Sequence, residues 1–318
     1  MESMFLTNKP TLVKKLVLID GLSRAGKFFF GKIVSGFKKM EYYQYVSLLE
    51  HIPYVERLGG ITEDAAISLL RVHIDEHAYN MRIGRNINLR YDDASSLYNS
   101  YELNEYLKRG LNQVNNEEVI NAFREDGRYS LFVTHENLPN IELFFKAYPG
   151  IKILNLIRHP VDVAHSWLLR GWGLRFGSDP LSFMPVVKGE KNPVPWYAGG
   201  WKEEYEKASE IDRIIKSIAS LVKYGEKACN SLQGNQKERI LTVRYENLVE
   251  ETSGIIDKVC TFLGTEPSDS MPQILSRERC PGRLPEEKRK KKAEEIGRLA
   301  SKDYYSLLMK LAKDYEEY

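Results

Sequence analysis

The chain has 318 residues, of which 42% are hydrophobic and 28% are charged. These proportions are those of a soluble globular protein, and this length can bury a large core as one α/β domain over 1–318. The net charge is only +2 at pH 7, so nothing in the composition calls for a nucleic acid partner.

The amino-terminal stretch MESMFLTNKPTLVKK contains no apolar run long enough for a signal peptide or a membrane anchor. We therefore expect a cytoplasmic protein without a membrane span. The three cysteines, Cys229, Cys260 and Cys280, are widely spaced. This spacing matches neither a disulfide framework nor a metal site, and we expect the thiols to be reduced.

The first predicted elements are a strand at 16–19, a glycine-rich turn at 21–26 and a helix from Lys27 onward. Such a turn presents backbone N–H groups and the amino end of a helix to an anion. The side chains that add donors and positive charge to it are those of Ser23, Arg24 and Lys27. This segment therefore predicts a phosphate site.

The turn also satisfies most of the nucleotide-binding P-loop pattern, as Gly21-x4-Gly26-Lys27. A P-loop NTPase requires a Ser or Thr at the next position to hold magnesium. This chain has Phe28 there. We therefore expect phosphate binding with no obligatory metal.

The aromatic run EYYQYVSLLEH, 41–51, predicts a strand-like segment with Glu50 near its end. The interval 57–128 is rich in charge and has apolar residues at helical spacing, which predicts a largely helical insertion. The next strand is predicted within 129–139, with His135 at its end. An imidazole suits proton transfer because its ordinary pKa lies near neutrality. A lone His or Glu is more often structural, so both interpretations stay open for His135 and Glu50.

Residues 151–157 predict a buried parallel strand that ends in Arg158, followed by a helix from Pro160 that carries Ser166. Open α/β sheets bind ligands at the carboxyl ends of their strands. A guanidinium and a hydroxyl at that edge can hold a phosphate between them. The alternative is a surface arginine paired with Asp162.

The carboxyl-terminal half predicts a loop-rich segment at 171–200 and a long helix at 201–233. A strand that breaks into an acidic turn follows at 239–251, then a basic loop at 277–292 and a final helix at 286–316. Tyr245 lies where this strand ends, and Arg283 follows a Pro-Gly turn in the basic loop. The Lys and Arg run 288–292 is expected to be the exposed start of the final helix.

Together these elements predict an α/β fold of three layers. A central, mostly parallel sheet carries the P-loop-like turn, helices cover both faces, and a largely helical insertion is added. Two phosphate cradles at strand ends, one of them lacking a magnesium hydroxyl, indicate a ligand with two separate phosphate groups.

With these motifs the sequence resembles the sulfotransferases that use 3′-phosphoadenosine-5′-phosphosulfate. Their first motif, Lys or Arg followed by Ser/Thr-Gly-Thr-Thr, is similar to 24–28, although Lys27 and Phe28 replace the two threonines. Their strand–Arg–x7–Ser element is similar to 158–166. Their strand ending in Tyr-Glu-Asp before a Phe-Leu-Gly is similar to 239–264. Their strand–Thr–His–x–x–Pro block is similar to 129–139, in which Pro139 comes one residue late.

The resemblance implies the residues that would hold the donor. Arg24 would contact the transferring sulfuryl group, and Lys27 the 5′-phosphate. Arg158 with Ser166 would hold the 3′-phosphate. The other turn residues of the donor site would be Gly21, Ser23, Ala25, Gly26 and Phe28.

The resemblance also implies an adenine site and a closing loop. Tyr245 would face the adenine and Phe29 would stack on it, although both could be ordinary core aromatics. Arg283 would close a basic loop over the 3′-phosphate. The insertion 57–128 would lie near the acceptor pocket.

The reaction implied is in-line displacement of the sulfuryl group by an acceptor hydroxyl or amine, which leaves adenosine 3′,5′-bisphosphate. His135 is the preferred base, ahead of Glu50, and Arg24 would stabilise the charge that develops. The acceptor would be a small molecule or a carbohydrate, with sugar, peptide tyrosine, lipid and phenol all open. The alternatives are a P-loop small-molecule kinase, which needs a hydroxyl at position 28, and a non-catalytic nucleotide-binding protein, which needs no base.

Overall fold

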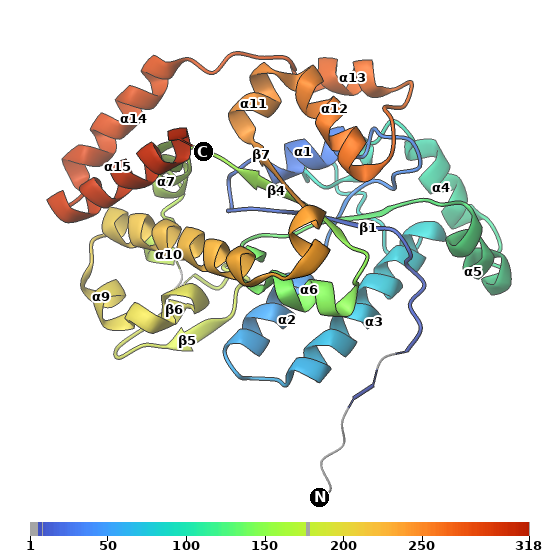
Figure 1. Cartoon of the computed structure of the whole chain (residues 1–318), viewed down its shortest axis with the longest axis horizontal. Coiled ribbons are helices and arrows are strands. Elements are labelled where there is room, and N and C mark those ends of the chain that lie inside the picture. The colour runs from blue at the N-terminus through green and yellow to red at the C-terminus, as the bar shows by residue number, and fades with distance from the viewer. Residues whose placement is uncertain (1–5, 8, 176–178, 318) are drawn as a thin grey trace, which may run out of the picture.

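The computed structural model describes residues 6–7, 9–175 and 179–317. At its centre is a five-stranded sheet with strand order β2-β3-β1-β4-β7 (Figure 1), in which every neighbouring pair is parallel. The strands are β1 Leu16–Asp20, β2 Gln44–Tyr45, β3 Ser130–Val133, β4 Lys152–Ile157 and β7 Ile240–Arg244. Because all five are parallel, their carboxyl ends meet at one edge of the sheet.

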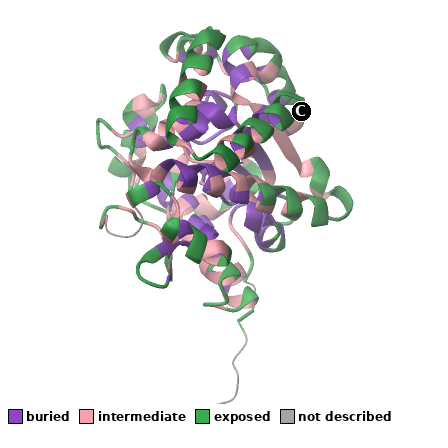
Figure 2. Ribbon diagram, turned by 90° about the vertical axis from the view of Figure 1, so that its left-hand side faces the viewer, coloured by how far each residue is buried: buried purple, intermediate pink, exposed green. Residues whose placement is uncertain are grey.

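The central strand β1 is buried on both faces, as its apolar sequence LVLID predicts. Val17 and Ile19 contribute to one hydrophobic cluster, and Leu16 and Leu18 to another. This alternation follows from the two-residue period of a strand. Figure 2 shows the consequence, with buried residues concentrated in the centre and exposed residues on the outer helices.

Helices cover both faces, so the predicted three-layer α/β fold is confirmed. The cluster around Val17 includes residues of α1 Lys27–Val34, α12 Thr252–Leu263 and α13 Met271–Arg277, among other elements. Those in the cluster around Leu18 are α2 Leu48–Arg57, α3 Glu63–Arg82 and α6 Ile141–Ala147.

A third cluster lies beside the sheet and joins α7 to the carboxyl-terminal helices (Figure 1). Its helices, which contact one another, are α7 Pro160–Leu168, α10 Glu210–Ser231, α14 Glu286–Leu299 and α15 Lys302–Glu317. α7 follows Arg158 directly, so this cluster supports one side of the predicted phosphate site.

The remaining elements connect these layers. The helices are α4 Leu103–Leu111, α5 Asn116–Glu125, α8 Trp172–Arg175, α9 Lys202–Lys207 and α11 Tyr245–Glu250. An antiparallel pair is formed by β5 Val186–Lys188 and β6 Pro193–Pro195. Four 3-10 helices are η1 Leu97–Asn99, η2 Leu138–Asn140, η3 Trp196–Trp201 and η4 Gly234–Arg239.

Two predicted long helices are each broken in two. The prediction over 201–233 is wrong at Ala208, which is extended at ψ 152°, and the Ser209 side chain caps α10 by accepting from the Asp212 N–H. The prediction over 286–316 is wrong at Ala300, with ψ 147°. There the Ser301 N–H donates to Asp212 at 3.0 Å. Asp212 therefore forms a hydrogen bond at each of the two helix breaks, with Ser209 at the first and Ser301 at the second, and α15 packs against α10.

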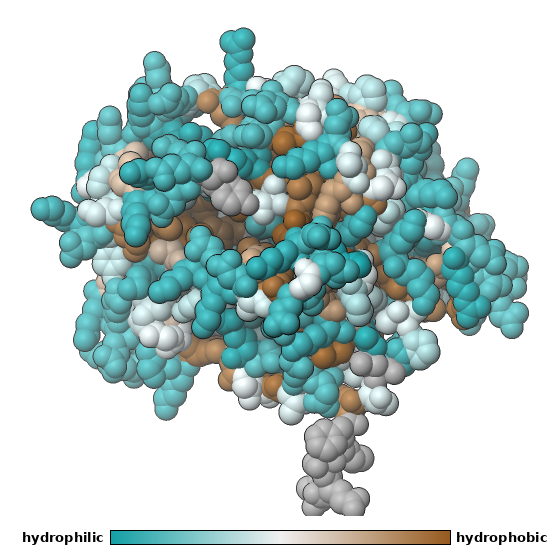
Figure 3. Space-filling model, in the orientation of Figure 1, coloured by the Kyte–Doolittle hydropathy of each residue, from teal (hydrophilic) through white to brown (hydrophobic). Residues whose placement is uncertain are grey.

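The predicted strand-like segment 41–51 is also shorter than expected. Only Gln44–Tyr45 is a strand, and Glu50 lies in the first turn of α2. The interval 57–128 is largely helical, as predicted, through α3, α4 and α5. Within the described residues, no helix has both the length and the apolar character that crossing a membrane requires. Hydrophilic side chains cover most of the face in Figure 3.

Candidate active site

The loop between β1 and α1 needs two glycines to approach its neighbours. Gly21 has φ 150° and Gly26 has φ 104°, both unfavourable for other residues. A Cβ at position 21 would lie 2.1 Å from the carbonyl oxygen of Leu156, and one at position 26 would lie 2.7 Å from the Tyr245 ring. The loop is therefore pressed against β4 and against the residue that follows β7.

Arg158 reaches this loop from the end of β4. Its Nη1 donates to the carbonyl oxygen of Arg24 at 3.0 Å, and its guanidinium lies 4.4 Å from the centre of the Tyr245 ring. Its Nε is buried and has no hydrogen-bond partner. A buried donor without a partner is costly, so this atom fits a site for an anionic ligand.

Arg24 lies in the same cluster. It adopts φ 74°, and its Nε donates to the Ser166 hydroxyl at 3.1 Å. Burial lowers the pKa of the Arg24 guanidinium, and the charges of Arg170 and Arg158 lower it further. No described carboxylate forms an ion pair with any of these three guanidiniums. An anion placed among them would relieve their mutual repulsion.

This arrangement brings together Arg24, Arg158 and Ser166, although the sequence assigned Arg24 to one phosphate cradle and Arg158 with Ser166 to another. Ser166 contacts Arg24, so the two predicted phosphate elements meet directly. Arg170 is a member that the sequence analysis missed. It lies one helical turn after Ser166, and that spacing was the available signal.

Lys27 does not face this cluster in the structure. Its ammonium is buried and donates to the carbonyl oxygens of Gly21 and Leu22, at 2.7 Å each. Burial lowers the pKa of Lys27, while the charges of Glu136, Asp20 and Glu50 raise it. The ammonium is thus an internal partner of three carboxylates. Two of the three ammonium N–H donors are thus used within the loop.

Asp20 joins the end of β1 to the turn after β3. Its carboxylate accepts hydrogen bonds from the Thr134 hydroxyl at 2.9 Å, the Asn137 N–H at 3.0 Å and the Leu138 N–H at 2.7 Å. Burial raises the pKa of Asp20 to about 6. These bonds fix the turn that carries His135.

His135 and Glu50 are bonded to each other. The His135 backbone N–H and its ring Nδ1 both lie 2.7 Å from Glu50 Oε1, and the Tyr45 hydroxyl donates to Glu50 Oε2 at 3.3 Å. The rings of Phe28 and Tyr45 meet the imidazole edge-on, at 5.6 and 5.2 Å. The two candidate bases therefore form one unit, which leaves Nε2 as the ring nitrogen without this bond.

Burial, together with two neighbouring cations, favours the neutral form of the imidazole. Burial lowers the pKa of His135 to about 3, with a further decrease from Lys27 and Arg24. Burial also raises the pKa of Glu50 to about 7, although the charge of Lys27 opposes the rise. Since the two groups share a hydrogen bond, their protons belong to the pair. A neutral imidazole at neutral pH can accept a proton.

A cavity of about 260 Å³ opens beside the pair. Its lining residues are Ser23, Tyr45, Glu50, His135, Glu136, Trp167, Trp172, Arg175, Leu181, Ser182, Phe183, Met184 and Tyr197. Trp167 connects this cavity to the loop, because its Nε1 donates to the Ser23 carbonyl at 2.9 Å. Among the described lining residues none comes from 57–128, and the expected place of that segment near the acceptor stays a prediction.

A second cavity, of about 60 Å³, contains Arg158 and Tyr245 together with basic side chains of α14. Arg289 pairs with Asp162 at 3.0 Å, and Lys292 pairs with the same carboxylate. Asp162 is thus bound by α14, in contrast to the alternative in which it pairs with Arg158. The run 288–292, expected to be simply exposed, turns part of its charge inward.

The lining residues from this run are Lys288, Arg289 and Lys292. Their spacing places them on one helix face, which is a signal that the sequence contained. Arg283, in contrast, is exposed and does not line this cavity. Its predicted role over the 3′-phosphate remains a prediction. Phe29 and Tyr245 contact each other edge-on, with ring centres 5.9 Å apart.

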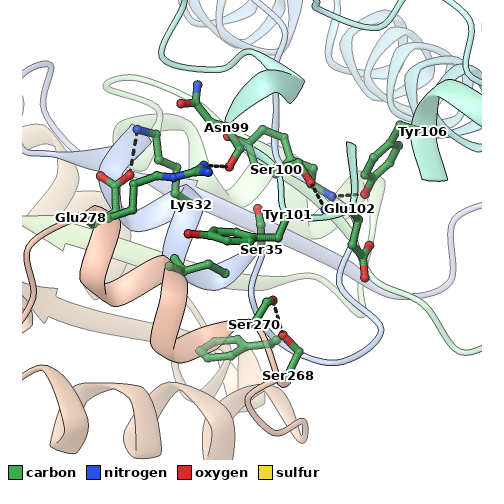
Figure 4. Close-up of a pocket in the computed structure, with 14 residues that line it drawn as sticks. Lys32, Ser35, Asn99, Ser100, Tyr101, Glu102, Tyr106, Ser268, Ser270 and Glu278 are labelled. Atoms are coloured by element: carbon green, nitrogen blue, oxygen red, sulfur yellow. Dashed lines mark hydrogen bonds and ion pairs between the residues drawn. The ribbon is translucent and has the colours of Figure 1, made fainter. Parts of the chain in front are cut away.

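A third cavity lies between α1, α13 and the segment around η1 (Figure 4). It is bordered by the Lys32–Glu278 ion pair and by Arg277, which donates to the Asn99 carbonyl at 2.7 Å. Its volume is about 20 Å³, room for about one water molecule. It is too small for a nucleotide or an acceptor.

The residues do not fit a P-loop magnesium site. At the position of the magnesium-binding hydroxyl, Phe28 stacks on Tyr43 and meets His135 edge-on. Within the described parts of the chain, no group of three or more His, Cys, Asp or Glu side chains is placed to hold a metal ion.

The protein is therefore an α/β protein with a cluster of arginines and a neighbouring cavity at the carboxyl edge of a parallel sheet. Residues 18–280 match the model of the sulfotransferase domain. The chain belongs to the sulfotransferase family, and it is a transferase. No curated protein matches it.

Several solved structures are similar to the chain. One is the sulfotransferase domain from the curacin biosynthetic pathway, with 14% identity, coverage of 86% of this chain and 81% of that one, and a TM-score of 0.47. Another is the sulfotransferase domain of the Synechococcus PCC 7002 olefin synthase, with 12% identity, coverage of 99% of this chain and 98% of that one, and a TM-score of 0.46. A third is sulfotransferase STF1 from Mycobacterium tuberculosis H37Rv, with 13% identity, coverage of 88% of this chain and 76% of that one, and a TM-score of 0.41.

Proposed function

We propose that the protein transfers the sulfuryl group of 3′-phosphoadenosine-5′-phosphosulfate to an acceptor hydroxyl or amine. The family supports sulfotransfer as the class of reaction. The cluster of guanidiniums without carboxylate partners supports a donor that is anionic at both ends. The donor supplies the sulfuryl group and departs as adenosine 3′,5′-bisphosphate.

The chain's own groups would divide the donor between them. The Arg24 guanidinium would bind the sulfuryl end, next to the cavity that contains His135. The loop N–H groups of Ser23 and Ala25 already donate to Glu136 and to the Leu22 carbonyl, so in this structure only the others could join it. Arg158, with its unpartnered Nε, would bind the 3′-phosphate together with Ser166. Fixed donors of this kind stabilise charge that develops on a leaving oxygen.

The adenine would lie against Tyr245 and Phe29, whose rings are beside the loop. For the 5′-phosphate, the backbone N–H groups at the amino end of α1 are already directed outward from the helix. The buried ammonium of Lys27 would support this loop from behind, and direct contact with the phosphate stays a prediction.

His135 is the proposed base, oriented by Glu50. The acceptor oxygen would form the new bond to sulfur, the bond from sulfur to the leaving oxygen would break, and the acceptor proton would go to His135 Nε2. The bond from Nδ1–H to Glu50 would hold the tautomer in which Nε2 is free. The same carboxylate would stabilise the imidazolium that results.

One observation carries the proposal. Arg158 Nη1 lies 3.0 Å from the carbonyl oxygen of Arg24, so the anion-binding ends of β1 and β4 are joined. The cavity that holds His135 and Glu50 includes Ser23 of the same loop. Anion site and base are therefore neighbours, which group transfer requires.

Calorimetry separates this proposal from the alternatives. Adenosine 3′,5′-bisphosphate should bind without magnesium, and ATP should bind more weakly with or without it. A preference for ATP with magnesium would favour the P-loop kinase. Binding of the bisphosphate with no sulfation of any acceptor would favour a non-catalytic nucleotide-binding protein.

The Arg158→Ala variant is expected to bind adenosine 3′,5′-bisphosphate about ten- to a hundredfold more weakly, because it loses a charge-assisted contact to phosphate. Calorimetry measures the change directly. The control is Arg298→Ala, which removes a guanidinium that is 77% exposed on α14 and should leave the affinity unchanged. An unaltered affinity in Arg158→Ala would remove Arg158 from the donor site.

The pH dependence of kcat should report the His135–Glu50 pair. Activity should fall as the pH drops through about 7, where Glu50 takes up a proton. A protonated carboxyl that donates to Nδ1 places the ring proton on Nε2, which can then no longer accept one. Two neighbouring carboxyls also have raised pKa values, Asp20 to about 6 and Glu136 by burial, so the assignment to Glu50 depends on the comparison with its Gln variant.

In the Glu50→Gln variant, the amide oxygen still accepts from Nδ1–H but has no proton to gain. The acidic limb of kcat should therefore move to lower pH, because only the depressed pKa of His135 remains. The measurement is kcat between about pH 5 and pH 9 in both proteins. An acidic limb at the same pH in both proteins would assign the limb to another group.

The cytoplasmic location expected from the sequence stays a prediction.

A further inference from the structure

We propose that the Glu136 carboxylate binds the Ser23 N–H in place of the donor, and that it releases this N–H by taking up a proton when the donor binds. Glu136 would thus compete, from within the chain, for the loop that binds the 5′ end of the donor. This inference rests on the proposed function. It gives a role to a buried carboxyl that the proposed mechanism does not use.

Glu136 contacts the loop between β1 and α1 at two points. Its backbone N–H donates to the Gly21 carbonyl at 3.1 Å, and its Oε1 accepts from the Ser23 N–H at 2.5 Å. The residue adopts φ 51°, a left-handed conformation that is uncommon outside glycine. Such conformations persist where the surrounding structure imposes them, and they cluster at binding sites. Here the backbone and the side chain of one residue are both bonded to the loop.

The contact lies where the donor would place its charge. Ser23 and Glu136 both line the cavity that contains His135, and Arg24 is the next residue of the loop. Under the proposed function, the sulfuryl end of the donor lies between that guanidinium and the imidazole. The N–H groups of a loop that leads into a helix are natural donors to anions. In this structure, the anionic group bound by one of them is a carboxylate of the chain itself.

The charge behind the loop is unbalanced. The buried Lys27 ammonium interacts with three buried carboxyls, those of Asp20, Glu50 and Glu136. One positive charge does not balance three negative ones, and burial raises the pKa of all three carboxyls. An anionic donor group at the loop would add to the negative surplus, and like charges in a buried site do not all stay ionised. Uptake of a proton by one carboxyl relieves the repulsion.

Glu136 is the carboxyl whose hydrogen bond the donor would replace. Asp20 is held by three donors of the turn after β3, and Glu50 is held by His135. The Glu136 side chain, in contrast, accepts from the loop itself. A protonated carboxyl is a weaker acceptor than a carboxylate. Protonation of Glu136 therefore frees the Ser23 N–H for an oxygen of the donor.

Ionisable groups from several elements face Glu136. They are Lys27 of α1, Tyr45 of β2, Glu50 and Tyr54 of α2, the adjacent His135, and Tyr197 of η3. All of them are retained in a Glu136→Gln variant. A comparison of this variant with the parent protein over a range of pH therefore isolates the Glu136 carboxyl.

Calorimetry with 3′-phosphoadenosine-5′-phosphosulfate, in the absence of an acceptor, tests the competition. Glu136→Gln keeps the shape of the side chain without its charge, and should bind this donor about tenfold more tightly than the parent. The difference should grow as the pH rises, because the parent must then protonate a carboxyl that is more fully ionised. The control is Glu142→Gln, which removes an exposed carboxylate of α6 that pairs with Lys146 at 3.0 Å. It should leave the affinity unchanged.

A second measurement needs no variant. At about pH 8 the phosphate groups of the donor are already ionised, so they do not release protons on binding. The parent protein should take up a proton for each donor that binds, which is measured from the binding enthalpies in two buffers of different ionisation enthalpy. Glu136→Gln should take up markedly less.

The outcomes are distinguishable from those of the proposed function. Equal or weaker donor binding by Glu136→Gln would make the carboxylate a support of the loop and overturn the inference. Donor binding by the parent without proton uptake would also overturn it, even if the variant does not fold. Both results leave sulfotransfer standing. A parent protein that binds neither the donor nor adenosine 3′,5′-bisphosphate would overturn the proposed function itself.

Discussion

Replacing His135 with glutamine is expected to lower kcat by about 10²- to 10⁴-fold, because the variant lacks the ring nitrogen that we propose takes up the acceptor's proton. The affinity for adenosine 3′,5′-bisphosphate should stay the same, since His135 lies on the acceptor side of the loop. Sulfated product is measured by mass spectrometry at saturating donor, and nucleotide affinity by calorimetry.

The matched control for this variant is His73→Gln. His73 lies on α3, where its Nδ1 pairs with Glu76 at 3.6 Å, and the change should leave kcat unaltered. If His135→Gln retains the parent kcat, the imidazole is not the base. If it loses nucleotide affinity together with kcat, the residue supports the fold of the loop and the role assigned to it is wrong.

The Lys27→Met variant should lose about 3–5 kcal/mol of unfolding free energy, because removal of one member of a buried charge group leaves the others uncompensated. The carboxylates concerned are Asp20, Glu50 and Glu136. All three have raised pKa values in the fold. Carboxyls of this kind bind protons more tightly when folded, so stability falls as pH rises. The loss in Lys27→Met should therefore be larger at pH 8 than at pH 6.

Denaturant unfolding measures both values, and two further variants interpret them. Lys38→Met removes an exposed ammonium that pairs with Glu266 at the surface, and should leave the unfolding free energy nearly unchanged. Lys27→Met combined with Glu136→Gln should recover part of the loss, because one buried charge is removed with its partner. A Lys27→Met protein that is fully stable but binds the bisphosphate poorly would instead support contact of Lys27 with the 5′-phosphate.

Much of the site could be predicted because parallel strands end at one edge. The sequence placed Arg24, His135 and Arg158 just after three strands, and no long-range contact had to be known for these residues to meet. The two-residue period of β1 likewise indicated burial on both faces. These are local signals, and the structure follows them.

Other features depend on contacts that a local pattern does not contain. Glu50 and His135 were alternatives in the sequence because their bond joins α2 to the end of β3. The inward turn of Lys27 depends on carboxylates from β1, α2 and the turn after β3. The helix break at Ala300 depends on Asp212, which lies far away in the sequence. In each case the deciding partner belongs to another element.

The carboxyl-terminal helix ends against the residue next to Arg158. Tyr315 donates to Glu246, the carboxylate that also accepts from the His159 N–H at 3.1 Å, and Glu316 pairs with the His159 ring. A protease cut before Tyr315 would therefore loosen the back of the proposed nucleotide site without altering Arg158 or Tyr245. Conversely, bound nucleotide should slow digestion of this end by a carboxypeptidase, because ligand binding and docking of the last helix support each other.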